Sequence, residues 1–143
     1  MNVKVILSSK GTTVTTIEPT ASVAAAVKLL TRHRIGAVVV TGAEHRVIGI
    51  VSERDVVRAF EAHGPAALEL PLTEVMTRRV ETCTTSDTIS SIMERMTAGK
   101  FRHVPVVEQG RLAGIISIGD VVKHRIEEME QEQAALRDYI QTA

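Results

Sequence analysis

The stretch GIVSERD at residues 49–55 returns in altered form as GIISIGD at residues 114–120. Each copy is a glycine, a short apolar run, and a serine followed three positions later by an aspartate. An apolar run that ends at Ser-x-x-Asp is typical of a strand leading into a helix, because a serine and an acid three residues later resemble a capping box. The sequence therefore contains one structural unit twice, and this repeat decides the fold.

The repeat extends well beyond these two stretches. An offset of 66 aligns Val23 with Ile89, Ala26 with Ile92, Val27 with Met93, Leu30 with Met96, Ile35 with Phe101, Val38 with Val104 and Val40 with Val106. The next loop differs by one residue, and an offset of 65 then aligns Gly49, Ser52 and Asp55 with Gly114, Ser117 and Asp120. A period near 65 is too long for a solenoid unit, so the two copies predict a pair of similar lobes packed together.

Each copy predicts the element order β-α-β-β-α. Short strands are expected at 14–17 and 80–83, and apolar strand pairs at 37–40 with 47–51 and at 104–107 with 112–116. The helices after the short strands have cap signals at Thr20 and at Ser86 and Asp87, and Gly99 is expected at the C′ position of the second of them. Further helices are expected to begin at Ser52 and Ser117.

These elements predict an α+β fold in which two small sheets are flanked by helices. Repeat 1 is expected to cover residues 1–70, and repeat 2 residues 71–143 with a helical extension. The stretch GPAALELP, with Pro65 and Pro71, is interpreted as the connection between the lobes.

The segment from Asp120 to Ile140 predicts one long amphipathic helix. Its apolar residues lie three, four or seven positions apart, and they are Val122, Ile126, Met129, Leu136 and Ile140. Such a stripe either closes over the core of its own lobe or packs against a second chain, and both interpretations stay open. The stripe is too short, and too interrupted by Gln133, to indicate a coiled coil.

Composition disfavours several classes of protein. The 143 residues are 44% apolar, and 17 basic residues balance 17 acidic ones, which disfavours nonspecific binding to nucleic acid or to a membrane surface. No apolar run suits a secretory signal or a membrane span. Cys83 is the only cysteine, which excludes an internal disulfide and suits a reducing cytoplasm. The histidine spacings predict no metal site, and no nucleophile elbow supports catalysis.

The repeated Ser-x-x-Asp has two interpretations. Helix initiation alone explains both copies. Alternatively, the free N–H groups at a helix start bind an anion, and a carboxylate in the first turn accepts the hydroxyls of a ribose. Basic residues near both copies favour a nucleoside phosphate, namely Arg54 and 32–34 in the first copy and Arg102 with His103 in the second.

The order of all these motifs resembles the CBS domain family, named after cystathionine β-synthase, in the tandem form called a Bateman module. The resemblance covers about residues 7–126, and it rests on GIVSERD and GIISIGD, on RIGAVVV and FRHVPVV, and on VMTRRVETC between the copies. The stretch FRHVPVVEQGRLAGIISIGDVVKHRI is especially similar to small stand-alone bacterial members. The resemblance implies two sheets packed face to face about a pseudo-twofold axis, with two clefts between the lobes.

The resemblance also implies a ligand and its contacts. Members bind adenosyl ligands in these clefts: AMP, ADP, ATP, NAD-type dinucleotides or S-adenosylmethionine. The residues expected at the ribose are Ser52, Asp55, Ser117 and Asp120, those near the adenine are Thr16, Ile35, Gly36, Ala37, Cys83, Val104 and Pro105, and those at the phosphate are Arg54, Arg102 and His103. The copies differ at these positions, so we expect two unequal sites, with Asp120 the stronger ribose ligand.

The implied role is a regulatory sensor that binds an adenine nucleotide without catalysis and forms a homodimer. Stand-alone members act on other chains, so an unidentified regulated protein is also expected. The alternative is a scaffold with empty clefts, which serves dimerisation or the docking of a partner.

Overall fold

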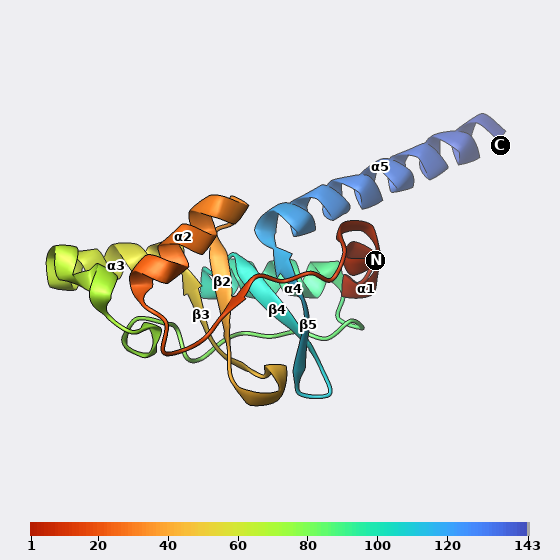
Figure 1. Ribbon diagram of the computed structural model, residues 1–143. Helices are drawn as coiled ribbons and strands as arrows, with labels where there is room; N and C mark the ends of the chain where they lie inside the picture. The colour runs from red at the N-terminus through yellow and green to blue at the C-terminus, as the bar shows by residue number, and fades with distance from the viewer. Residues whose placement is uncertain (143) are drawn as a thin grey trace.

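The computed structural model describes residues 1–142 and has a mixed α+β architecture (Figure 1). The elements in chain order are α1 (Val3–Lys10), β1 (Thr16–Ile17), α2 (Val23–His33), β2 (Ala37–Thr41), η1 (Ala43–His45), β3 (Val47–Ser52), α3 (Glu53–His63), η2 (Gly64–Glu69), η3 (Leu72–Glu74), α4 (Ile89–Gly99), β4 (His103–Glu108), β5 (Arg111–Ser117) and α5 (Ile118–Thr142). The predicted fold class, with two small sheets flanked by helices and a long C-terminal helix, is confirmed.

The two sheets repeat one another in register. Strand β2 pairs with β3 antiparallel and with β1 parallel, and β4 pairs with β5 antiparallel. Ala37 lies opposite Ser52, as His103 lies opposite Ser117, and both hairpins carry an irregularity near their far end. The strand predicted at 80–83 is reduced to a single parallel bridge between Cys83 and Val106. Each sheet thus presents its Ser-x-x-Asp motif at the same place, where the last strand becomes a helix.

The helix N-caps predicted at Thr20 and Ser86 are wrong. Helices α2 and α4 are capped by Ser22 and Thr88, whose side chains accept hydrogen bonds from backbone N–H groups three residues later. Asp87 instead closes the preceding turn, where its carboxylate accepts a backbone N–H from three residues earlier. Turns and caps favour the same residue types, so composition alone placed these starts two residues too early.

The role predicted for Gly99 is also wrong. Gly99 is the last residue of α4, and Lys100 adopts the left-handed conformation (φ 57°), as Arg34 does after α2 (φ 53°). Glycine is required at 99 for a different reason. A Cβ at this position would lie 2.3 Å from the ring of Phe101, so the aromatic side chain packs directly on the glycine backbone.

Each buried core receives a segment from the other half of the chain. The first cluster contains Val23, Ala26, Val40, Val51, Leu72 and Met76, and the second contains Val3, Ile6, Leu7, Cys83, Ile89, Ile92, Met96, Val104, Val106, Ile116 and Val121. Helix α1, which the sequence analysis did not predict, therefore packs with the second repeat. The stretch interpreted as a connection carries one three-ten helix, η2, and a second, η3, follows it. Residues of both segments pack with the first repeat. The division at residues 70 and 71 stays a prediction.

Two segments pack with the other half of the chain, residues 1–10 and residues 70–77, and we call them the crossing segments; matching backbone hydrogen bonds hold both. The N–H of Val23 donates to the carbonyl of Leu70, and the N–H of Ile89 donates to that of Met1. In the opposite direction, Leu72 donates to the carbonyl of Ala21, with a counterpart between Val3 and Asp87. The reciprocal exchange ties the halves together and agrees with a pseudo-twofold relation.

The repeated glycine of the opening motif has a packing reason. A Cβ at Gly49 would lie 2.5 Å from the sulfur of Met76, and a Cβ at Gly114 would lie 2.7 Å from a methyl carbon of Leu7. Met76 and Leu7 lie on the two crossing segments. Glycine thus allows each crossing segment to approach the last strand of its sheet.

Helix α5 confirms the long amphipathic helix, but its apolar stripe does not close over the core. Val121 and His124 are buried, whereas Val122, Ile126, Met129, Leu136 and Ile140 are exposed. Figure 1 shows the helix leaving the body and projecting beyond α1. Neither α5 nor any other helix of residues 1–142 is long and apolar enough to cross a membrane.

Candidate ligand-binding clefts

The first Ser-x-x-Asp motif forms a complete capping box. The backbone N–H of Ser52 donates to Oδ2 of Asp55 over 2.8 Å, and the N–H of Asp55 donates to the hydroxyl of Ser52. The Ser52 hydroxyl also donates to Oδ2, and the hydroxyl of Thr77 donates to Oδ1 over 2.9 Å. Both carboxylate oxygens are therefore held by the protein, and Asp55 is only 6% exposed.

The second motif makes the same reciprocal bonds but has a different third partner. The N–H of Ser117 donates to Oδ2 of Asp120, and the N–H of Asp120 donates to the Ser117 hydroxyl. The Lys10 ammonium donates to the same Oδ2 over 2.7 Å. Within residues 1–142 no hydrogen bond reaches Oδ1 of Asp120, and this side chain is 21% exposed. Asp120 therefore keeps a free acceptor oxygen that Asp55 lacks.

The surroundings of Asp120 keep it ionised. Partial burial raises the pKa of its carboxyl, but the hydrogen bonds from Lys10 and Ser117 and the charge of Lys10 outweigh that effect, so the pKa lies below its ordinary value. An ionised carboxylate is acceptor-only, which is the form that two ribose hydroxyls require.

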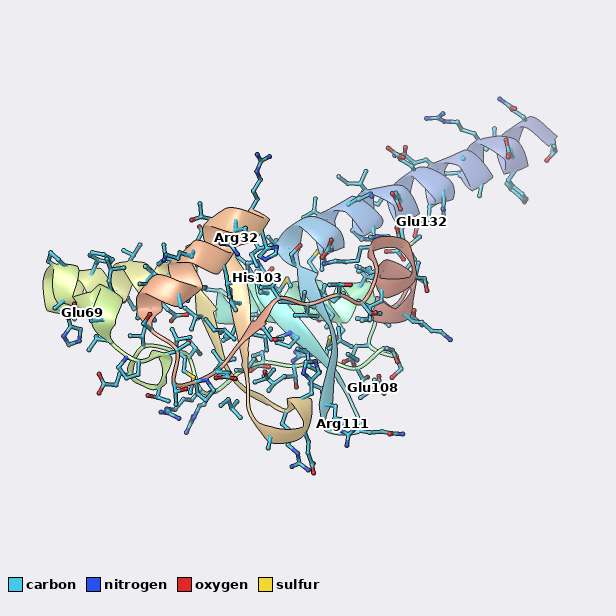
Figure 2. All side chains as sticks on the ribbon, in the orientation of Figure 1. Arg32, Glu69, His103, Glu108, Arg111 and Glu132 are labelled. Atoms are coloured by element: carbon cyan, nitrogen blue, oxygen red, sulfur yellow. The ribbon has the colours of Figure 1, made fainter. Side chains whose placement is uncertain are left out.

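Side chains from the two halves meet beside this carboxylate. A Cβ at Gly36 would lie 3.0 Å from Cε1 of His103, so the imidazole of the second repeat packs on the backbone of the first. From the first repeat, the guanidinium of Arg54 donates to the carbonyl of Lys100 over 2.9 Å. Figure 2 shows His103 near the middle of the molecule.

His103 lies in the field of charges from both halves. Burial has the largest effect and lowers the pKa of His103. Glu53 and Asp120 raise this pKa, whereas Lys10 and Arg102 lower it, and the net pKa lies below the ordinary value. The imidazole is therefore predominantly neutral at pH 7, when it offers one donor and one acceptor.

A hollow lined by residues of both halves lies where Arg54 contacts Lys100, and neither Asp120 nor His103 is among its lining residues. It has a volume of about 280 Å³ and is lined by Arg54, Met96, Thr97, Lys100, Phe101, Arg102 and Ile118. Two residues predicted at the phosphate, Arg54 and Arg102, therefore share one surface depression. The lining combines cationic groups with apolar side chains, a mixture that suits an anionic ligand with an apolar part.

The residues predicted near the adenine are mostly enclosed. Cys83, Val104, Pro105 and Ala37 are buried, whereas Thr16, Ile35 and Gly36 are half-buried. Burial raises the pKa of the Cys83 thiol to about 12, with smaller contributions that include Asp87, so this thiol is un-ionised at neutral pH. Contact of these residues with a base stays a prediction.

Sequence reasoning missed two partners of the acids, Thr77 and Lys10. Thr77 stands in the stretch VMTRRVETC between the copies, which carries part of the family resemblance but predicts no contact with an acid. Lys10 lies 110 residues before the acid it contacts, and no local pattern marks it. Within residues 1–142 no group of three or more histidine, cysteine, aspartate or glutamate side chains could hold a metal ion.

Comparison with known families accounts for the repeated arrangement. The family model described as CBS domain matches residues 10–62 and again residues 72–127. The chain belongs to the CBS domain family. Both copies of the motif lie inside the matched segments, and the resemblance inferred from the sequence is confirmed.

Solved structures of CBS-domain proteins share this fold. The CBS-domain containing protein ATU1752 from Agrobacterium tumefaciens is 51% identical and superposes with a TM-score of 0.83, covering 87% of this chain and 92% of that one. The CBS domain pair of protein MJ0100, in complex with 5′-methylthioadenosine and S-adenosyl-L-methionine, has a TM-score of 0.79 over 90% of this chain and 98% of that one. Its identity of 23% makes this a likeness of fold alone.

A curated relative is longer than this chain. The mitochondrial CBS domain-containing protein CBSX3 of Arabidopsis thaliana is 34% identical over 120 residues, which are 81% of this chain and 58% of that protein. This CBS pair therefore matches little more than half the length of that relative.

Proposed function

We propose that this CBS pair is a regulatory module that binds an adenine nucleotide, such as AMP, ADP, ATP or an NAD-type dinucleotide, between its repeats without catalysing a reaction. The observation that carries the proposal is the ionised carboxylate of Asp120, with a free Oδ1, whose charge acts on His103 together with that of Arg102. A carboxylate serves the ribose hydroxyls, and cationic groups serve the phosphate.

The same fold supports this assignment. The CBS pair of protein MJ0100 holds two adenosyl compounds. We expect the two proposed sites to be unequal, because both oxygens of Asp55 are occupied by Ser52 and Thr77. We assign the stronger site to Asp120 and a mainly structural role to Asp55. Adenine contacts are expected from the half-buried Ile35, Gly36 and Thr16.

The alternative function is a scaffold for dimerisation or partner docking, and one observation favours it. The stripe on α5 is exposed, with Ile126 at 50%, Met129 at 47% and Leu136 at 59%. Exposed apolar side chains in a row are typical of an interaction surface. Dimerisation through this stripe is compatible with nucleotide binding, so the two roles are separated by whether the clefts bind a ligand.

Thermal unfolding with AMP, ATP and NADH tests the proposed function. A ligand that binds only the folded state, at one hundred times its Kd, raises the free energy of unfolding by about 2.7 kcal/mol. We expect a higher Tm with at least one of the three nucleotides. GTP at equal concentration controls for general anion effects. An unchanged Tm with all three adenine nucleotides at millimolar concentration would contradict the proposal and favour the scaffold.

The α5 stripe predicts a homodimer that charge substitution disrupts. The combined change Ile126→Glu and Met129→Glu puts two carboxylates on the stripe, where an interface would bury them without partners. Light scattering at micromolar concentration should give twice the 15.5 kDa chain mass for the wild type and the single mass for this variant. Lys123→Glu, an exposed substitution on the same helix, is the control. A monomeric wild type, or a variant that stays dimeric, would contradict this assignment.

A further inference from the structure

Lys10 is the residue around the second acid that neither the repeat nor the motif predicts. It is the last residue of α1, and its side chain is 31% exposed. The ammonium donates to Oδ2 of Asp120 over 2.7 Å and to the carbonyl of Ile115 over 3.0 Å. The carboxylate of Asp120, which we assign to the ribose, and the carbonyl of Ile115 thus hold the Lys10 ammonium at the junction of β5 and α5.

At the first acid, Asp55, the hydrogen bonds that correspond to those of Lys10 come from the neutral hydroxyl and backbone N–H of one residue, Thr77. Thr77 donates its hydroxyl to Asp55 over 2.9 Å and its backbone N–H to the carbonyl of Ile50 over 2.9 Å. Ile50 and Asp55 are the counterparts of Ile115 and Asp120 at an offset of 65. The ammonium of Lys10 therefore takes the place of a hydroxyl and an amide, and it lies 2.7 Å from Oδ2 of Asp120. The cation paired with Asp55, the guanidinium of Arg58, is 74% exposed and stays 4.0 Å from Oδ1, so the closer and less exposed cation is the one at Asp120.

This charge changes which ligands the second cleft favours. Lys10 offsets the negative charge of Asp120, so this carboxylate repels an anionic ligand group less than an unpaired one would. The Lys10 charge also reaches His103, because it contributes to lowering the pKa of that imidazole. A ligand with a phosphate gains from this added charge, whereas a neutral nucleoside with the same base and ribose does not.

We propose that Lys10 is a specificity-determining residue that makes the Asp120 cleft select phosphorylated adenosine over uncharged or cationic adenosyl compounds. The inference rests on the proposed function and adds to it the class of ligand. The geometry that carries it is the Lys10 bridge to Asp120 and Ile115, with a neutral threonine in its place at the other acid.

Titration calorimetry with AMP and with adenosine tests the inference, because the two probes differ only in the 5′-phosphate. The wild type should bind AMP more tightly than adenosine. Lys10→Met keeps the length of the side chain and removes the charge, and it should lower the AMP affinity about tenfold while the adenosine affinity changes by less than about twofold. Lys10→Arg should restore most of the preference for AMP.

Lys4→Met is the matched control. Lys4 is exposed on the same helix, so the variant has the same net charge as Lys10→Met and should keep the wild-type preference. Equal losses of AMP and adenosine affinity in Lys10→Met would show a merely structural role and overturn the inference, as would an unchanged preference. A wild type that binds neither AMP nor adenosine would overturn the inference, and it would overturn the proposed function as well only if ATP and NADH also fail to bind.

Discussion

Leu72→Ala is expected to lower the free energy of unfolding by about 2–5 kcal/mol, the range for a leucine removed from a packed core. Leu72 is fully buried, and it packs with Val23, Val40 and Val51 of the first repeat although it follows the last helix of that repeat. Its backbone N–H also donates to Ala21. The substitution leaves a cavity where the crossing segment enters the core. Urea unfolding followed by circular dichroism gives the value.

Leu136→Ala is the matched control for this experiment. The same atoms are removed from a side chain that is 59% exposed on α5, so the expected change lies within about 0.5 kcal/mol at a concentration where the chain is monomeric. A Leu72→Ala variant as stable as the control would contradict the reciprocal packing of the crossing segments. It would mean that residues after 70 contribute nothing to the first core.

Asp120→Asn should weaken AMP binding at least roughly tenfold. Hydrogen bonds to a charged group contribute about 1.5–3 kcal/mol each, and the amide replaces one acceptor oxygen with a donor that faces the ribose hydroxyls or Lys10. The substitution preserves size, and an asparagine still has one oxygen for the capping bonds of the Ser117 motif. Calorimetry with AMP measures the loss, and circular dichroism verifies that the variant is folded.

Asp55→Asn separates the ribose assignment from helix capping. Asp55 is buried and accepts from both Ser52 and Thr77, so its amide variant should lose about 1 kcal/mol of stability and keep most of the AMP affinity. The expected pattern is therefore a loss of binding in Asp120→Asn and a loss of stability in Asp55→Asn. Unchanged AMP affinity in a folded Asp120→Asn variant would leave both motifs as helix caps.

The repeat allowed most of the fold to be predicted from local patterns. Strands β2, β3, β4 and β5 follow from short apolar runs, and α5 follows from a helical spacing that continues for more than five turns. The helix starts at Ser52 and Ser117 were also predicted, because a capping box is formed by residues three positions apart. These features depend on neighbours along the chain, so the sequence contains them directly.

Helix α1 could not be predicted in the same way. Its stabilising contacts are Val3, Ile6 and Leu7 in a core whose other members begin at Cys83. An eight-residue helix is too short to be stable alone, and its tertiary partners decide that it forms. The short strand expected at 80–83, before α4, does not form, because only Cys83 pairs with the neighbouring strand β4.

The sequence by itself determined the two repeats, their order of elements, the CBS family and the pair of acids, since all of these are local patterns that occur twice. Only the tertiary structure decided that the two acids differ. Asp55 and Asp120 have the same local motif but different third partners. Asp55 accepts a hydrogen bond from the hydroxyl of Thr77, 22 residues later, whereas Asp120 accepts one from the ammonium of Lys10, 110 residues earlier. A hydrogen bond depends on distance in space, and the crossing of the two chain segments brings these partners to the acids.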